Sequence, residues 1–358
     1  MRRHTQGEGH LLKSSNCRPA LWGAVAGAFL LSLSSLLPAH AGGTSSGWRV
    51  VVPQHLAPLF HQGDGVGVDR HNAVYVWDSL ESRVRKFSPS GKLLNWWHVV
   101  QATPGSPWAP NHLAVDPQGN SSVLTLTGGI RRYSPSGKLL EHWAAAPNAV
   151  AVAAGGSGNV FVLSRIGTVQ PNSPQPAGGN ARVDKYSPQG SLLATWRTPT
   201  IVVKDVEPDG IAVDSRGNVY VTVGTDNSCY KVCLPMTSVM YRFDPAGAIT
   251  FTYIPGRKTF GPISAVDRQG NLYLLPHDFA FDSMNILKLS PTGTKLAQWP
   301  GFGGILKQAL LLQVDGNGRM IVTSSKVRGL SPRQRSAVVR ILSPAGKQIA
   351  QFGQILVR

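Results

Sequence analysis

Cysteine is scarce in this chain, which limits what can hold the fold together. Only three of the 358 residues are cysteines, and Cys17 stands apart from the other two. Cys229 and Cys233 are close enough in sequence to predict a local disulfide in an exported chain. A loop this short adds little global stability, and a zinc site would need a second ligand pair that is not nearby.

Long hydrophobic runs are also missing, with one exception near the start. Residues 20–37 are apolar or small, basic residues precede them, and a small-residue cleavage pattern ends at residue 41. This combination predicts a signal peptide at residues 1–41 and an exported protein, periplasmic or secreted. The alternative is an uncleaved membrane anchor, since the run reaches the lower length limit of a membrane span. No second run is long enough, so no stable membrane span is expected after cleavage.

Acidic residues are few, with 18 Asp and Glu against 35 Lys and Arg. Residues 1–41 hold four basic residues and one acidic residue, so 31 and 17 remain beyond them, a net charge of +14. This sign favours anionic partners such as cell-surface polymers, lipid headgroups or nucleic acid. The alternative is a soluble protein from an organism whose exported proteins are basic in general. No Ser-His-Asp or Cys-His arrangement can be found.

Glycine and proline, in contrast, are abundant, and many of them belong to one repeated turn. Six times, a Pro-x-Gly turn has a large apolar residue two positions before the proline and an aromatic residue six positions after the glycine. The copies are 46 to 57 residues apart, a period typical of propellers and solenoids. The six prolines are Pro89, Pro135, Pro188, Pro245, Pro291 and Pro344. The six aromatic residues are Trp97, Trp143, Trp196, Tyr253, Trp299 and Phe352.

Each copy contains four segments with the alternating pattern of antiparallel strands. The Pro-x-Gly turn joins the last two strands, and an Asp-x-x-Gly-Asn turn joins the first two in the second, fourth and fifth copies. The first copy keeps only the aspartate of this turn, the sixth keeps the aspartate and the glycine, and in the third copy a longer Gly-rich turn at residues 153–159 replaces it. Four-stranded meanders repeated radially predict an all-β, six-bladed β-propeller over residues 64–353. The expected blades span residues 64–100, 111–145, 148–198, 209–255, 261–301 and 309–353.

The segment before the first blade, residues 42–63, is a candidate for closing the ring. Residues 48–52 alternate weakly, and we expect them to pair with the last blade around residues 347–352. The alternative is a loose terminus.

The repeat resembles the NHL repeat over nearly all of residues 64–353. The shared features are an apolar-x-Val-Asp-x-x-Gly-Asn segment, clearest at residues 210–223, followed by a third strand, Pro-x-Gly and an aromatic residue. The resemblance implies a six-bladed propeller. It implies little about function, because NHL-type propellers include RNA-binding domains, ligand-sensing ectodomains, lyases and scaffolds.

Binding residues are expected on the face that carries the blade connections and the loops between second and third strands. These loops are longest in the third to sixth copies, and long loops on a rigid scaffold often carry function; the alternative is drift in tolerant surface loops. The basic loop residues are Arg165, Lys231, Lys326, Arg328 and Arg333, which form either an anion-binding rim or a solvated basic face. The polar residues at the expected channel mouth are Asp64, Asn111, His112, Asn148 and Asp209.

A metal site is the second hypothesis. His112, Asp209 and His277 could hold a divalent cation on the propeller axis, as a metal-dependent lyase or hydrolase of the propeller class would need. A single buried histidine is more often structural.

We therefore expect an exported binding module that recognises a protein, a glycan or an anionic cell-surface polymer through the long-loop face of blades 3 to 6. A monomer is expected, and nucleic acid is not, because export leads to a compartment without RNA.

Overall fold

The computed structural model describes thirteen stretches of the chain. They are residues 49–51, 65–79, 81–99, 112–125, 129–166, 179–200, 205–226, 237–254, 263–275, 285–299, 309–325, 337–353 and 355–357. The predicted signal peptide and the pair Cys229 and Cys233 lie outside these residues. Within them, no helix has the length and hydropathy of a membrane span.

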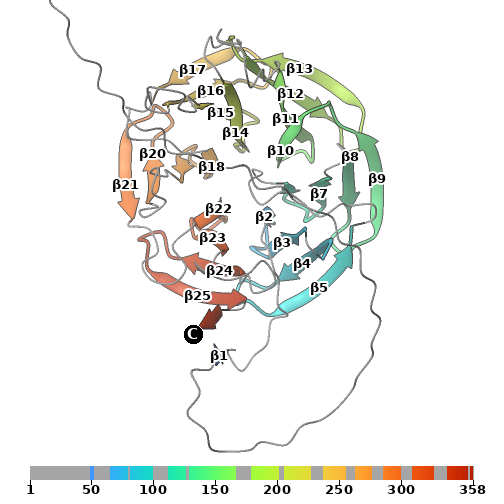
Figure 1. The fold of residues 1–358 in the computed structure, drawn as a ribbon, viewed down its shortest axis with the longest axis vertical. Coiled ribbons are helices and arrows are strands. Elements are labelled where there is room, and N and C mark those ends of the chain that lie inside the picture. Colours follow the sequence, from blue (N-terminus) through green and yellow to red (C-terminus); the bar gives the residue numbers. More distant parts are fainter. Residues whose placement is uncertain are drawn as a thin grey trace, which may run out of the picture. The chain divides into compact units, whose positions relative to one another are not determined.

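The described strands form six four-stranded antiparallel sheets around a common centre, as the sequence predicts (Figure 1). Each sheet, or blade, uses four consecutive strands; the first lies nearest the centre and the fourth lies at the perimeter (Figure 1). Blades 1 to 3 are β2 (Gly65–Val68), β3 (Val74–Asp78), β4 (Arg83–Phe87) and β5 (Leu93–His98); β6 (Leu113–Val115), β7 (Ser121–Leu124), β8 (Gly129–Tyr133) and β9 (Leu139–Ala144); and β10 (Ala149–Ala154), β11 (Val160–Ile166), β12 (Asn180–Tyr186) and β13 (Leu192–Arg197). Blades 4 to 6 are β14 (Asp205–Val213), β15 (Val219–Asp226), β16 (Thr237–Phe243) and β17 (Ile249–Tyr253); β18 (Ile263–Val266), β19 (Leu272–Leu274), β20 (Ile286–Leu289) and β21 (Lys295–Trp299); and β22 (Ala309–Val314), β23 (Met320–Ser325), β24 (Ala337–Leu342) and β25 (Gln348–Gly353).

The aspartate of the first turn organises each blade that has one, and blade 5 shows how. Asp267 is buried, and one carboxylate oxygen accepts backbone N–H groups from Gln269 at 3.0 Å and Asn271 at 2.8 Å. The other oxygen accepts the Asn271 amide at 2.9 Å and the Tyr273 hydroxyl at 3.3 Å, and it pairs with Lys288 at 3.1 Å. Burial favours the neutral acid, but these donors outweigh it and lower the pKa of Asp267. The aspartate is therefore structural.

The glycine and aromatic columns of the repeat meet in space, each glycine against the aromatic residue of the preceding blade. A Cβ on Gly137 would lie 2.9 Å from Trp97, and one on Gly190 would lie 2.8 Å from Trp143. A side chain at these positions would displace the ring that fills the interface between two blades. The six pairs are Gly91 with Phe352, Gly137 with Trp97, Gly190 with Trp143, Gly247 with Trp196, Gly293 with Tyr253, and Gly346 with Trp299.

Among the described residues the core is divided into six clusters, one between each pair of neighbouring blades. Between blades 1 and 2, for example, Trp77, Leu113 and Tyr133 are all buried in one cluster. Because every interface has its own cluster, the ring is stabilised by packing between blades.

The ring closes by packing between blades 6 and 1, and the expected strand pairing was wrong. The strand β1 (Arg49–Val51) pairs with β26 (Ile355–Val357) in a separate two-stranded sheet, and residues 348–353 pair with β24 instead. Phe87 and Phe352 lie 4.7 Å apart between ring centroids, and Gly316 donates its N–H to Asn72 at 3.2 Å. The partner of residues 49–51 is therefore the segment after blade 6, residues 355–357, and not blade 6 itself.

Candidate functional site

The propeller has two unlike faces. We call the side with the Asp-containing and Pro-x-Gly turns the turn face, and the side with the blade connections and the loops between second and third strands the connecting face. On the turn face, ion pairs join Asp116 to Arg132 at 2.6 Å and Asp315 to Arg319 at 2.6 Å, and these carboxylates are almost fully buried. Buried carboxylates with these partners are not available to a ligand, so Asp116 and Asp315 are structural.

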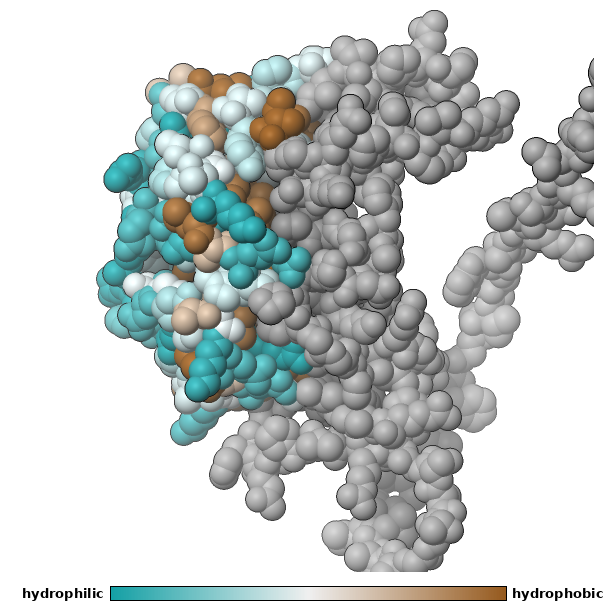
Figure 2. Space-filling model, turned by 90° about the vertical axis from the view of Figure 1, so that its left-hand side faces the viewer, coloured by the Kyte–Doolittle hydropathy of each residue, from teal (hydrophilic) through white to brown (hydrophobic). Residues whose placement is uncertain are grey.

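The outer surface is mostly polar where the structure describes it on the side of blades 4 to 6 (Figure 2). Apolar residues form separate brown patches there among hydrophilic ones (Figure 2). Among the described residues of these three blades, the exposed large apolar ones are Ile249, Ile254, Leu296 and Ile349. Scattered apolar residues of this kind are normal on a soluble surface and define no site.

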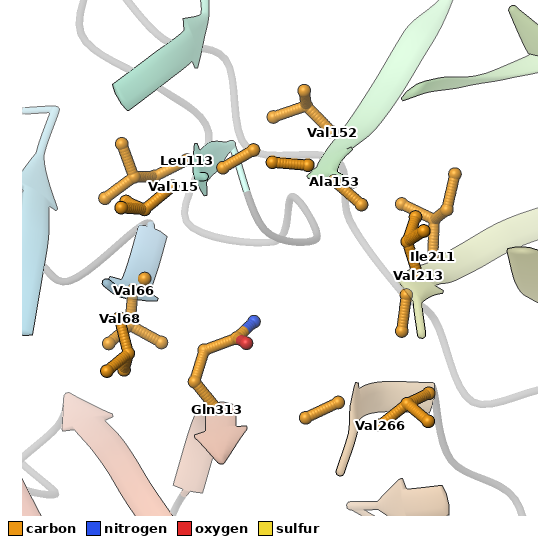
Figure 3. Close-up of a pocket in the computed structure, with 15 residues that line it drawn as sticks. Val66, Val68, Leu113, Val115, Val152, Ala153, Ile211, Val213, Val266 and Gln313 are labelled. Atoms are coloured by element: carbon orange, nitrogen blue, oxygen red, sulfur yellow. The ribbon is translucent and has the colours of Figure 1, made fainter. Parts of the chain in front are cut away.

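A cavity of about 70 Å³ lies at the centre of the ring, between the first strands of the blades (Figure 3). Its described lining is apolar except for Gln313, whose amide points toward the middle of the cavity (Figure 3). Each first strand has a partner strand on one side only, so backbone groups on its other edge face the cavity and water can satisfy them. With no titratable side chain in its described lining, the cavity supplies no acid or base.

His112 lies immediately before β6 and is only 5% exposed. Burial lowers the pKa of its imidazole to about 4, and a hydrogen bond to the backbone of Val150 in blade 3 opposes this only in part. The imidazole is therefore neutral at physiological pH and bridges blades 2 and 3. A neutral imidazole is also the form that binds metals.

The structure describes only some of the other predicted site residues. Asn148 and Arg165, predicted at different places, come together in blade 3, where the Arg165 N–H donates to the Asn148 carbonyl at 3.0 Å. Asn148 is exposed with a φ of 59°, and Arg165 is half-buried. Asp209 lies in β14, beside a register shift between Pro208 and Gly210. The predicted residues outside the described stretches are Asp64, Asn111, Lys231, His277, Lys326, Arg328 and Arg333.

A charged cluster in blade 1 was not predicted. Asp78 is fully buried and pairs with Arg85 at 3.1 Å, and Arg85 also pairs with Glu81. Glu81 pairs in turn with Arg83 at 3.4 Å. Arg83 lies 4.7 Å from the ring centroid of Trp96. The signal in the sequence is the doubled tryptophan of blade 1, where the other copies have one aromatic residue at the last position of the repeat.

Metal-binding geometry is not seen among the residues with described side chains, which contain no group of three His, Cys, Asp or Glu able to hold an ion. The triad of His112, Asp209 and His277 is not tested by this, because His277 is outside the described residues and the side chain of Asp209 is not described.

The chain is thus an all-β protein, a six-bladed β-propeller of four-stranded antiparallel blades. No family model matches it, so the resemblance to the NHL repeat stays a prediction. No curated protein matches its sequence either.

Solved structures share the fold at low sequence identity. A catalytically inactive virginiamycin B lyase from Staphylococcus aureus, crystallised with quinupristin, is 12% identical, with 86% of this chain and 88% of that chain covered at a TM-score of 0.51. Hydrazine synthase from Kuenenia stuttgartiensis is 10% identical, with 84% and 89% covered at 0.53. Regucalcin, a calcium-binding protein from Agrobacterium tumefaciens, is 14% identical, with 84% and 95% covered at 0.50. These neighbours differ in function, so the likeness establishes the fold alone.

Proposed function

We propose that the protein is an exported binding module of the NHL-like propeller class. Its binding surface is the connecting face of blades 3 to 6, and its ligand is an anionic cell-surface polymer. The observation that supports this most is the contrast between the two faces. On the turn face, carboxylates such as Asp116 and Asp267 form structural ion pairs. The connecting segments differ from blade to blade in length and charge.

The charge of the connecting segments supports an anionic ligand. The undescribed stretches between residues 52 and 336 contain nine Lys and Arg against three Asp and Glu. A surface enriched in one sign raises the local concentration of oppositely charged ligands and speeds their association. The predicted signal peptide agrees with a partner at the cell surface.

A pair of matched charge variants tests this proposal. The variant K326E/R328E/R333E changes three predicted binding residues, and K92E/K138E/K347E makes three charge reversals at exposed lysines on the turn-face side. With heparin as a model anionic polysaccharide, we expect the first variant to lose at least about tenfold in affinity, or about 1.4 kcal/mol, and the second less than about twofold. Equal losses would mean unspecific charge attraction and would refute the proposed surface.

Export has its own test. If residues 1–41 are a signal peptide, the mass of the protein recovered from the periplasm or medium corresponds to a chain that begins at Gly42. Recovery of the full-length chain in the membrane fraction would instead favour the anchor.

A second candidate function is a metal-dependent lyase or hydrolase, and one observation favours it. His112 is buried, and its imidazole is neutral, which is the form that binds a metal. Asp209 and His277 would complete the predicted ligand set.

Metal analysis of the purified protein separates the two candidates. The lyase hypothesis predicts about one equivalent of a divalent cation that H112A or D209N removes, whereas D244N, a substitution in a turn-face loop, leaves it bound. Metal-free protein that still binds heparin would support the binding module.

A further inference from the structure

Trp96 stands out when the six copies of the repeat are compared. It lies five residues after the glycine of the Pro-x-Gly turn, on the outermost strand β5, and is 47% exposed. The five other blades have polar residues at this position, which are His142, Thr195, Thr252, Gln298 and Gln351. The neighbouring Trp97 already fills the interface with blade 2, so packing between blades does not explain a second tryptophan.

The surroundings of Trp96 are charged and ordered. The Arg83 guanidinium lies 4.7 Å from the centroid of the indole, and His98 meets the indole edge-on at 5.5 Å. Arg83 also donates to the His98 ring at 3.4 Å and pairs with Glu81 at 3.4 Å. The guanidinium lies over the indole, and about half of the Trp96 side chain is exposed. The indole therefore offers an apolar surface to solvent that is bordered by hydrogen-bonding groups. We call Glu81, Arg83, Trp96 and His98 the Trp96 patch.

The base of the patch is rigid. Glu81 is shared between Arg83 and Arg85, and Arg85 is anchored on the fully buried Asp78. A platform held in this way loses little side-chain freedom when a ligand binds.

We propose that the Trp96 patch binds a glycan, with the C–H face of one sugar ring stacked on the indole and its hydroxyls hydrogen-bonded to the surrounding side chains. Sugars combine an apolar ring face with a rim of hydroxyls, which matches this arrangement. An apolar protein surface fits less well, because covering the patch would remove Arg83, Glu81 and His98 from water without giving them new partners. The patch lies on blade 1, so this site is separate from the proposed surface of blades 3 to 6.

The expected affinity is modest. The patch is a surface and not a cleft, so one ring and a few hydrogen bonds should give a Kd of about 1 mM for a short oligosaccharide.

The test is a titration of the folded protein with neutral chitohexaose and, separately, cellohexaose, followed by the indole N–H resonance of Trp96 in NMR. This resonance is assigned as the one missing in W96A. We expect it to shift with millimolar sugar in at least one titration. Affinities of the wild type and W96A are compared through the backbone amide resonances of β5, which both proteins have, and W96A should lose at least about tenfold. The matched control H142A changes the same position in blade 2 and should bind as the wild type does. Circular dichroism should be unchanged in W96A, because the side chain is exposed.

Three results would overturn the proposal: no shift of the Trp96 resonance with either sugar, undiminished binding by W96A, or a concentration-dependent dimer that W96A abolishes, which would make the patch an interface between two copies. Heparin binding distinguishes a failure of this proposal from a failure of the proposed function. W96A should leave it intact, and K326E/R328E/R333E should leave the sugar titration intact.

Discussion

Blades 5 and 3 build the same turn from different residues, and the differences are coupled. Blade 5 has Asp267 at the turn, with the Tyr273 hydroxyl and Lys288 both directed at its carboxylate. Blade 3 has glycine in place of the aspartate, and the residue aligned with Tyr273 is Phe161. Blade 3 therefore lacks both the carboxylate that accepts the hydrogen bond and the tyrosine hydroxyl that donates it. The cation remains, because its cation–π contact does not depend on the hydroxyl: Lys185 lies 5.8 Å from the centroid of the Phe161 ring, as Lys288 lies 5.0 Å from that of Tyr273.

Support for the turn of blade 3 comes from its neighbour. The Gly155 N–H still donates to the Asn159 carbonyl at 2.9 Å, so the backbone turn is kept without a carboxylate. Arg132 of blade 2, which pairs with Asp116, also donates to the Gly158 carbonyl at 3.0 Å. A lost contact within one blade is thus partly replaced by one between blades.

The largest expected effect on stability comes from replacing a glycine by alanine where it packs against blade 5, compared with the same change in the turn of blade 3. In G346A the methyl group would overlap Trp299 of blade 5, and Gly346 has a φ of 82°. Strain and overpacking together should cost about 3 kcal/mol. In G156A, in the turn of blade 3, the methyl group meets nothing within 4 Å, so the change should be within about 0.5 kcal/mol. Urea unfolding at constant m-value measures both, and similar midpoints would contradict the interface role of the Pro-x-Gly glycine.

Acid pH should loosen the junction between blades 2 and 3 and spare the first strand of blade 5. His112 has its pKa lowered to about 4 from 6.5, so the unfolded state binds its proton first as the pH falls. Stability is complete above pH 6.5 and about 3 kcal/mol is lost by pH 4. The first strand of blade 5, β18, has no titratable residue, and its Ile263 is buried. Unfolding midpoints between pH 7 and 4 should fall less steeply in H112L than in the wild type or in H142L, and equal slopes would refute the assignment.

The sequence predicts the repeated parts of this fold well and the unique parts poorly. Glycine, proline and aromatic columns recur six times, so each copy supports the others, and the blade strands follow from them. The meeting of Gly137 with Trp97 across two blades could not be predicted, because it depends on how neighbouring blades pack. The closing pair β1 and β26 occurs once and has weak alternation, which is why its partner was misplaced. The Trp96 patch needs the three-dimensional arrangement of β4 and β5.

Removing the charge of Asp267 sharpens the comparison within blade 5. D267N keeps the shape of the side chain and loses the ion pair with Lys288, and it should cost about 2 kcal/mol at pH 7. Since the pKa of Asp267 is lowered from 3.8, the wild-type advantage is present above pH 3.8 and disappears as the pH falls through the lowered pKa. D244N, in a half-exposed turn position, should cost less. An advantage that does not shrink as the pH falls below 3.8 would show that the charge is not responsible.

The smallest effect tests the coupling itself by exchanging the two aromatic residues. Y273F removes a hydroxyl bonded to Asp267 at 3.3 Å and should cost about 1 kcal/mol. F161Y adds a hydroxyl at a position 2% exposed, where glycine has replaced the aspartate that would accept it; it should therefore also destabilise, by about 1 to 2 kcal/mol. If the turn residue and the aromatic residue are coupled, both substitutions lower the free energy of unfolding, which urea unfolding measures. If F161Y is neutral or stabilising, the residues of blade 3 differ from those of blade 5 independently, and the absence of the aspartate does not explain the phenylalanine.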